Sequence, residues 1–355
     1  MIQNFLAKIL LSPISLLYGV GVGLRNFFYR KDMIRGIEFD VPVISVGNMS
    51  IGGAGKTPHI EYLIRLLQPY LNVATLSRGY KRKTKGYIEV RHDHDANIVG
   101  DEPLQFKRKF PEVLVTVAEN RTFAIPKIMM RQENTHAVLL DDAFQHLAVK
   151  PGLNILLTEY SKPFTQDFLL PSGRLREWRS AYKRADVIIV SKCPPAMSEE
   201  ERQQFIDEIK PFPHQKMFFS YYKYGYPYYL FKKDYKIILE EDMDVELVCA
   251  IAKTDYLMDY LVEEVNTVQL LEYEDHRYFT KYDLGHVKKI FDNLPSKRKV
   301  ILTTEKDAMR LELHKKFLAE NKLPIFALPV EVAFHFDQAA EFDALVKHFL
   351  LNFKI

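Results

Sequence analysis

The chain has 355 residues, 47% of them hydrophobic, and a formal net charge of only +3 at pH 7. This length allows two domains, the composition is typical of globular proteins, and the overall charge gives no indication of a nucleic-acid partner. The two cysteines, Cys193 and Cys249, lack the close spacing of metal-binding pairs and favour a reducing compartment.

The N-terminal segment is apolar and contains a long uncharged stretch. Residues 9–24 have no charged side chain, and cations and aromatic residues follow them. Spanning a bilayer takes about 20 apolar residues, and Pro13 and three glycines weaken a long helix here. An apolar stretch followed by such residues is typical of a segment in the membrane interface. We predict a membrane-associating segment at residues 1–30, with a buried core helix as the alternative.

A glycine-rich loop then connects a predicted strand, Val41–Val46, to a predicted helix, Pro58–Leu67. The loop matches G-x-x-x-x-G-K-[ST] except at its first position, which holds a serine. Amide groups at a helix N-terminus bind phosphate, the lysine adds charge, and the threonine hydroxyl can bind Mg²⁺. We predict a nucleotide-binding loop formed by Ser50, Ile51, Gly52, Gly53, Ala54, Gly55, Lys56 and Thr57.

Strand and helix patterns alternate after this loop. This order predicts an α/β fold, with a mostly parallel sheet of the P-loop NTPase type covered by helices on both faces. The predicted strands are 73–76, 113–117, 137–140, 155–157 and 187–190, and the predicted helices are 102–109 and 120–131.

Two carboxylates, Asp141 and Asp142, follow the predicted strand 137–140. Adjacent carboxylates at this edge of a sheet repel each other unless a cation is present, and in P-loop enzymes such a group holds Mg²⁺ or its water. We therefore predict a Mg²⁺ site formed by Thr57, Asp141 and Asp142. A helix N-cap is the alternative for Asp142.

Two other short motifs carry groups that can move a proton. In "GDEP", residues 100–103, two acids stand beside a glycine and a proline at a helix start, where a carboxylate can cap the helix or take a proton from a hydroxyl. In "YEDHRYF", Asp275 and His276 precede a predicted helix, and a lone histidine is more often structural than catalytic. The residues alone leave both roles open.

Arginines in two loops are candidate phosphate ligands, because a guanidinium offers a planar fork of donors. Arg174, Arg176 and Arg179 lie in "LLPSGRLREW", and Arg78 follows the strand 73–76. Solvated surface charge is the alternative for the first three.

The nucleotide base is predicted to be adenine. Guanine is usually read by Asn-Lys-x-Asp after a late strand, but Lys192 is followed by Cys193 and then Pro194. The "TTEKD" segment at 303–307 lacks the spacer between lysine and aspartate. ATP is therefore the expected nucleotide.

The composition of the sequence changes near residue 216, where aromatic residues become frequent. The aromatic segment 217–231 is predicted to form a hairpin, and α/β alternation resumes after it. We predict a nucleotide-binding kinase domain at 31–215, joined by this hairpin to a smaller α/β domain at 216–355. The smaller domain is predicted to have strands at 246–251, 265–271 and 300–302 and helices at 279–293 and 337–351.

Seven motifs occur in order: "VPVISVGNMSIGGAGKTP", "LSRGY", "GDEP", "LLDDAFQH", "LLPSGRLRE", "DHRYF" and "TTEKDAMRL". With this set the chain resembles the tetraacyldisaccharide 4'-kinase family, the lipid A kinases of Gram-negative bacteria, from its N-terminal segment to about Leu311. It departs at Ala143, where glycine is usual, and at Ala54, where Thr, Ser or Asn is common. Neither departure changes a reacting group.

The resemblance implies transfer of the ATP γ-phosphoryl group to the 4'-hydroxyl of a tetraacylated glucosamine disaccharide 1-phosphate, giving lipid IVA. It implies that Asp101 is the catalytic base and His276 its partner, and that Arg78 and Arg176 contact phosphates. Lys56 would hold phosphates, and Thr57 with Asp142 or Asp141 would bind Mg²⁺. Because Asp101 and His276 lie in different predicted domains, catalysis is expected to require domain closure.

The resemblance also implies a peripheral or monotopic enzyme on the cytoplasmic face of the inner membrane. Its partners would be the acylated disaccharide lipid and the membrane surface, with no nucleic acid and no implied protein partner. The main alternative function is a membrane-associated P-loop ATPase that acts as a nucleotide-dependent switch.

Overall fold

The computed structural model describes residues 2–354, and side chains from residue 10 onward. The chain forms two compact units, each built from more than one segment. The first unit comprises Met1–Arg78, Val113–Tyr222 and Val332–Ile355, and the second comprises Gly79–Glu112 and Lys223–Glu331.

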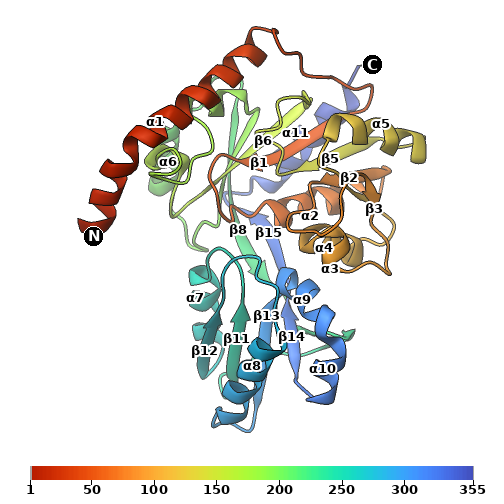
Figure 1. The fold of residues 1–355 in the computed structure, drawn as a ribbon, viewed down its shortest axis with the longest axis vertical. Helices are drawn as coiled ribbons and strands as arrows, with labels where there is room; N and C mark the ends of the chain where they lie inside the picture. Colours follow the sequence, from red (N-terminus) through yellow and green to blue (C-terminus); the bar gives the residue numbers. More distant parts are fainter. Residues whose placement is uncertain (1, 355) are drawn as a thin grey trace. The chain divides into compact units, whose positions relative to one another are not determined.

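The first unit is a layered α/β structure (Figure 1). Its helices are α1 (Ile2–Arg30), α2 (Lys56–Leu67), α5 (Arg121–Arg131), α6 (Glu199–Ile209) and α11 (Ala339–Leu351). Its strands are β1 (Val43–Asn48), β2 (Val73–Ser77), β4 (Leu114–Val117), β5 (Ala137–Asp141), β6 (Leu153–Glu159), β7 (Val187–Ser191), β8 (Lys216–Tyr224) and β15 (Val330–Phe334).

The strands of the large sheet that belong to this unit run in the order β15-β8-β7-β6-β1-β5-β2-β4. All described pairings from β8 to β4 are parallel. Every residue of β1, β2, β5, β6 and β7 is buried, as expected for a parallel sheet covered on both faces. The chain leaves β1 toward β2 and later crosses to β6 on its other side. The carboxyl end of β1 therefore lies where the strand order reverses, which is the usual binding edge of such sheets.

Helix α1 is continuous from Ile2 to Arg30 and includes Pro13. One side of it contacts the loop after β6: the Ser15 hydroxyl donates to the Leu169 carbonyl (3.2 Å), and the Trp178 indole donates to the Gly19 carbonyl (2.7 Å). Away from these contacts the helix exposes Leu10, Ile14, Leu16, Leu17, Val20, Leu24 and Phe27. None of the helices in residues 2–354 combines the length and hydrophobicity needed to cross a bilayer.

The second unit has a smaller sheet in the order β10-β9-β14-β13-β11-β12. Strands β14, β13, β11 and β12 pair in parallel, and β9 pairs antiparallel to both β14 and β10. The strands of this sheet are β9 (Tyr228–Tyr229), β10 (Lys232–Lys236), β11 (Asp244–Cys249), β12 (Thr267–Glu272), β13 (Lys299–Thr304) and β14 (Ile325–Leu328). The short strand β3 (Ile88–Glu89) lies in segment 79–112 and is not part of this sheet. The helices are α3 (Ala96–Val99), α4 (Asp101–Lys109), α7 (Asp255–Glu264), α8 (Lys281–Asn293), α9 (Glu305–Leu311) and α10 (Lys315–Glu320).

The α/β class is confirmed, but the compact units differ from the predicted division at residue 215. Segment 79–112 clusters with the second unit, and the closing helix α11 belongs to the first. The aromatic segment is also not one hairpin. Its first part is β8, which pairs in parallel with β7, whereas Tyr228–Tyr229 join the smaller sheet. Buried side chains such as Phe218 and Phe219 place β8 in the large sheet rather than in an exposed connection.

Candidate active site

The glycine-rich loop connects the carboxyl end of β1 to the first turn of α2, as predicted. Gly55 caps α2 with a φ of 82°, and Gly52 has a φ of 120°. A Cβ at Gly55 would clash with the Tyr222 hydroxyl, and the left-handed backbone also favours glycine at this position. Ser50 needs no such freedom, because its backbone is not left-handed and bridges to Leu175. This explains why serine is tolerated at the first motif position.

Polar side chains hold the backbone of the glycine-rich loop in place through hydrogen bonds to its carbonyl groups. The Asn48 amide donates to the Ser50 carbonyl (2.8 Å), and the Ser191 hydroxyl donates to the Ala54 carbonyl (2.9 Å). His59 lies 2.7 Å from the Gly55 carbonyl through Nδ1 and 3.0 Å from the Ser220 hydroxyl through Nε2. Burial lowers the pKa of His59 to about 4, against the opposing effect of the Gly55 carbonyl. The ring is therefore neutral, with its proton on Nδ1 facing Gly55.

Asp141 and Asp142 lie beside this loop, because β5 pairs directly with β1 and Val46 is in register with Asp141. The Ser77 hydroxyl at the end of β2 donates to Asp141 Oδ2 (3.3 Å). Asp142 has a φ of 47°, and buried Arg121 donates to its carbonyl (3.2 Å) and to that of Asp141 (2.8 Å). The alternative role of Asp142 as a helix N-cap is not observed, since residues 142–148 form no helix.

Asp142 is the centre of a charged cluster. Its carboxylate accepts two hydrogen bonds from Arg176, one at each oxygen (2.9 and 3.2 Å), and lies 3.6 Å from the Lys56 ammonium. Burial would raise the pKa of Asp142, but the cations of Lys56 and Arg176 outweigh it and hold the pKa well below its usual range. Lys56 also donates to Asn48 Oδ1 (3.1 Å). Lys56, Arg176 and Asp142 are thus held together beside the glycine-rich loop.

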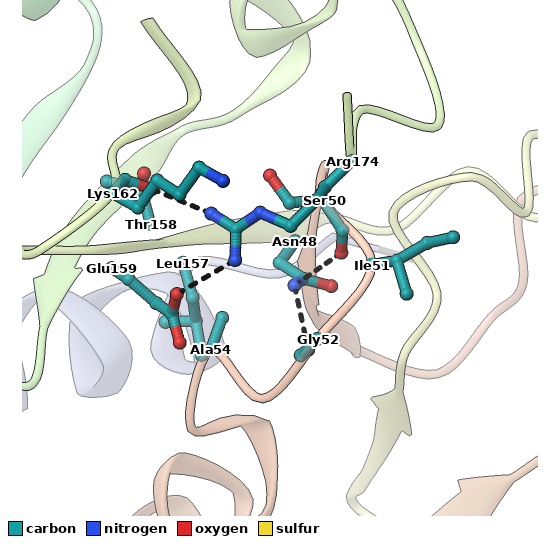
Figure 2. Close-up of a pocket in the computed structure, with 10 residues that line it drawn as sticks. All are labelled: Asn48, Ser50, Ile51, Gly52, Ala54, Leu157, Thr158, Glu159, Lys162 and Arg174. Carbon is teal, nitrogen blue, oxygen red and sulfur yellow. Dashed lines mark hydrogen bonds and ion pairs between the residues drawn. The ribbon is translucent and has the colours of Figure 1, made fainter. Parts of the chain in front are cut away.

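The other two arginines of the "LLPSGRLREW" loop have structural partners. Arg174 donates to Asp167 (2.9 Å) and contacts Glu159 (3.4 Å), and Arg179 donates to the Asp167 carbonyl (2.7 Å). Figure 2 shows Arg174 reaching across a small pocket beside the glycine-rich loop toward Glu159 and the Lys162 carbonyl. Of the three arginines, only Arg176 reaches Asp142.

Arg78 directly follows β2 at the same sheet edge and is exposed. Its charge, like that of Arg176, acts on the buried Arg121 guanidinium. No hydrogen bond or ion pair within residues 10–354 holds the Arg78 side chain. It is therefore available to bind an anion.

Asp101 and His276 meet in the second unit. His276 Nδ1 lies 3.0 Å from Asp101 Oδ2, and both side chains are largely buried. Asp101 begins α4, and its other oxygen accepts the Glu102 backbone N–H (2.9 Å). The expectation that the pair is assembled from two domains is therefore wrong, because segment 79–112 belongs to the same unit as His276.

Strained backbone positions hold this pair in place. His276 has a φ of 58°, its N–H donates to the Ala250 carbonyl (3.0 Å), and its carbonyl accepts from Lys81 (3.3 Å). Gly100, with a φ of 92°, packs so closely on Gly79 that an added Cβ would lie 3.2 Å from the Gly79 Cα. The "SRGY" and "GDEP" motifs therefore meet through their glycines.

Cations surround the Asp101 carboxylate. Arg310, fully buried in α9, lies 3.5 Å from Asp101 Oδ2, and Lys306 stands nearby on the same helix. Burial would raise the pKa of Asp101, but Lys306, His276 and Arg310 together hold it well below its usual range. Lys306 and Arg310 were not predicted as site residues. Their signal was the "TTEKDAMRL" motif, which contributed to the family resemblance but was assigned no role beyond the excluded one of binding guanine.

Comparisons with known proteins agree with this geometry. Residues 7–350 match the model of a family described as Tetraacyldisaccharide-1-P 4'-kinase. The chain is 40% identical to the Tetraacyldisaccharide 4'-kinase of Phocaeicola vulgatus, over 96% of this chain and 94% of that protein. It is also 40% identical to the kinase of the same name from Flavobacterium johnsoniae, over 98% of each chain.

A solved structure also has this fold. The crystal structure of LpxK from Aquifex aeolicus in complex with ATP superposes with a TM-score of 0.72 at 26% sequence identity. The match covers 97% of this chain and 99% of that one, so it includes both compact units.

Proposed function

Because the chain belongs to the tetraacyldisaccharide-1-P 4'-kinase family, we propose that it transfers the γ-phosphoryl group of ATP to the 4'-hydroxyl of a tetraacylated glucosamine disaccharide 1-phosphate. The product would be the 1,4'-bisphosphorylated lipid of lipid A biosynthesis, lipid IVA. The observation that supports this most is the Lys56–Asp142–Arg176 cluster at the mouth of a glycine-rich loop.

In this proposal the first unit binds the nucleotide. The backbone N–H groups from Ser50 to Thr57 surround the phosphates, at the positive end of α2. Lys56 follows the γ-phosphoryl group and neutralises the charge that develops during transfer. Arg176 and the exposed Arg78 contact phosphate oxygens, since arginine binds them with paired donors. Asp142 and Asn48 fix Lys56 and Arg176 before substrate arrives.

The residues at this edge fit a magnesium ion. Mg²⁺ prefers oxygen ligands, and the Thr57 hydroxyl and the carboxylates of Asp141 and Asp142 lie on adjoining segments. Asp142 is ionised and half-exposed, with a 37% accessible side chain. When bound, the ion neutralises phosphate charge and aligns the phosphate oxygens. Thr57, Asp141 and Asp142 are the proposed ligands.

In the second unit, Asp101 is proposed to accept the proton of the sugar hydroxyl. Its low pKa makes it a weak base, which would be a handicap if the proton had to leave before attack. Phosphoryl transfer passes through a loose transition state in most analyses, so the nucleophile loses its proton late, when it has become acidic. A weak base that is always ionised and rigidly held suits that timing. His276 holds the carboxylate through Oδ2 (3.0 Å).

We further propose that α1 brings the enzyme to its lipid on the cytoplasmic face of the membrane, where ATP is available. The side facing the rest of the first unit uses small or polar residues such as Ser15, Gly19 and Asn26. The opposite side is apolar, with Leu10 79% and Leu17 74% exposed. A helix with one such face lies in the interface plane, where an acylated substrate also resides.

The central experiment combines purified protein, ATP, Mg²⁺ and the disaccharide 1-phosphate. We expect acceptor-dependent ATP consumption and a product that gains one phosphate at the 4'-position, identified by ³¹P NMR and mass spectrometry. ATP hydrolysis that is equally fast without the lipid would instead favour the nucleotide-dependent switch.

The membrane proposal is tested with point substitutions, because deleting α1 would also uncover Trp178 and its neighbours. Replacing Leu10, Leu17 and Leu24 by serine should reduce binding to phospholipid vesicles while ATP binding is kept. The matched control replaces three exposed apolar residues elsewhere, Tyr70, Met130 and Tyr282, by serine. Equal vesicle binding by the two triple variants would refute the role of α1.

A further inference from the structure

Lys306 is a largely buried lysine whose ammonium contacts three different groups. It lies in the first turn of α9, with Nζ 2.9 Å from His276 Nε2, 3.2 Å from Glu102 Oε1 and 4.0 Å from Asp275 Oδ1. The side chain is 19% exposed. Burial lowers the pKa of Lys306, but the carboxylates of Glu102, Asp101 and Asp275 more than offset this, so the group remains a cation.

The contact with His276 determines where that ring can carry its proton. An ammonium group has three donors and no acceptor, so the nitrogen facing it must offer a lone pair. His276 Nε2 is therefore unprotonated, and the single ring proton resides on Nδ1. Nδ1 faces Asp101 Oδ2, so Lys306 donates a hydrogen bond to His276 and His276 donates one to Asp101.

We propose that Lys306 is a positioning residue that keeps His276 neutral and in the Nδ1–H form, so that His276 orients the Asp101 carboxylate without taking a proton from the acceptor. This inference rests on the proposed function for its consequence in catalysis. The arrangement leaves His276 with no free lone pair. The proton removed from the sugar hydroxyl must then go to Asp101, where it balances the O–H bond that breaks.

The neighbours of His276 show why a positive charge is needed at Nε2. The carboxylates of Asp101, Glu102 and Asp275 lie around the ring. Among the described residues, removal of Lys306 would leave only Arg310 and Lys81 as opposing cations, which would favour a doubly protonated imidazolium. That imidazolium would form an ion pair with Asp101 and weaken it further as a proton acceptor. The charged and titratable groups around His276 are Asp101 and Glu102 of α4, Lys306 and Arg310 of α9, Asp275 and Tyr278 of its own loop, and Tyr80 and Lys81.

The test uses Lys306→Met, which keeps the length of the side chain but removes its charge and donors, and Lys306→Arg, which keeps both. Lys316→Met is the matched control, because that lysine is 91% exposed. With histidine labelled by ¹⁵N and assigned through His276→Gln, the full-length parent protein should show His276 protonated at Nδ1 only across the neutral range. Lys306→Met should show a second protonation as the pH falls through that range.

Kinetics provide the second readout. Lys306→Met should lower kcat about 10–100-fold, the range found when a partner that orients a functional side chain is lost. The KM for ATP should not change, and kcat should acquire a new acid limb that Lys306→Arg largely removes. A parent protein with Nε2 protonated, or a folded Lys306→Met with the parental tautomer and pH profile, overturns the proposal. The NMR result stands whether or not lipid is phosphorylated, so failure of the proposed function is seen separately in the product assay.

Discussion

The two functional clusters differ in how the chain builds them. The nucleotide edge of the first unit comes mainly from one contiguous loop and from Asp141–Asp142 at the end of the adjacent strand, with Arg176 added from the loop after β6. The Asp101 cluster of the second unit gathers single residues from segments near 80, 101, 276 and 306. The conformation of a contiguous loop at a sheet edge is determined largely by local sequence, whereas the second cluster forms only when the whole unit is folded.

The difference extends to electrostatics. In the first cluster one carboxylate, Asp142, faces Lys56 and Arg176, which leaves positive charge for a polyanionic ligand. In the second, Asp101, Glu102 and Asp275 surround Lys306, with Arg310 behind them. The first cluster is suited to holding phosphate, and the second to holding a fixed ionised base.

The largest expected effect is at Lys56. Lys56→Ala removes the cation nearest the developing charge and should lower kcat by about 10³–10⁵, as loss of a catalytic arginine does in related phosphoryl transfer. The control Lys347→Ala changes an exposed lysine of α11 and should be neutral. Circular dichroism and steady-state kinetics are the measurements. Near-normal turnover by folded Lys56→Ala would mean that the first cluster is not the phosphate site.

The second effect tests whether Asp101 and His276 act as one group. Asp101→Ala should cost about 10²–10⁴ in kcat, the usual range for general acid–base catalysis. His276→Ala should cost less, and the double variant should be little worse than Asp101→Ala, because groups that serve one step are non-additive. ATP affinity, measured by direct binding, should barely change. Fully multiplicative losses would separate the two residues, and loss of ATP binding in Asp101→Ala would make it a nucleotide or metal ligand.

The same contrast explains what the sequence could predict. The parallel sheet, the loop Ser50–Thr57 and the position of Asp141 beside it follow from apolar runs and a known motif, because each depends on neighbours in sequence or on adjacent strands. Arg176 was identified together with Arg174 and Arg179, since the sequence does not show that the latter two bind Asp167.

The second cluster could not be predicted in this way. His276 on its own resembles an ordinary structural histidine, and only the resemblance to a family paired it with Asp101. Two features of the fold bring the residues together. His276 has a left-handed backbone, and segment 79–112, which contains Asp101, belongs to the same unit as His276. Lys306 was missed because its partners, Glu102 and His276, lie 204 and 30 residues away along the chain, and no local pattern encodes such contacts.

A third, smaller effect contrasts Asp101 with another buried carboxyl of the second unit. Glu246 in β11 is fully buried, and neither of its carboxyl oxygens has a hydrogen-bond partner in the described structure. Burial, with a smaller contribution from Asp292, raises the pKa of Glu246 to about 8. Unlike Asp101, this group folds in its protonated form.

Glu246 should therefore make stability fall as the pH rises. Since the folded state binds a proton that the unfolded chain releases above about pH 4.5, the penalty grows between pH 4.5 and about 8 and is then constant. Glu246→Gln should be more stable than the parent at pH 8.5, by on the order of 5 kcal/mol, and should melt at a correspondingly higher temperature. At pH 5 the two proteins should melt at similar temperatures. Exposed Glu320→Gln is the control. A gap that does not depend on pH would show that Glu246 does not titrate in this range.

The smallest effect is expected at Arg78, which is exposed and makes no side-chain bond within residues 10–354, in contrast to Arg176, which is fixed by Asp142 and Asn48. An exposed guanidinium contributes to phosphate binding but little to positioning, because it is not held in place before the ligand arrives.

Arg78→Ala should raise the KM for a phosphate-bearing substrate about 10-fold, or 1.4 kcal/mol, with kcat nearly unchanged. Arg78→Lys should recover part of the loss, since it keeps the charge but not the fork of donors. Arg91→Ala, at a 69% exposed arginine, provides the control. Steady-state kinetics with ATP and lipid varied in turn will show which substrate Arg78 contacts, and a fall in kcat without a change in either KM would instead place Arg78 among the groups that act in the transition state.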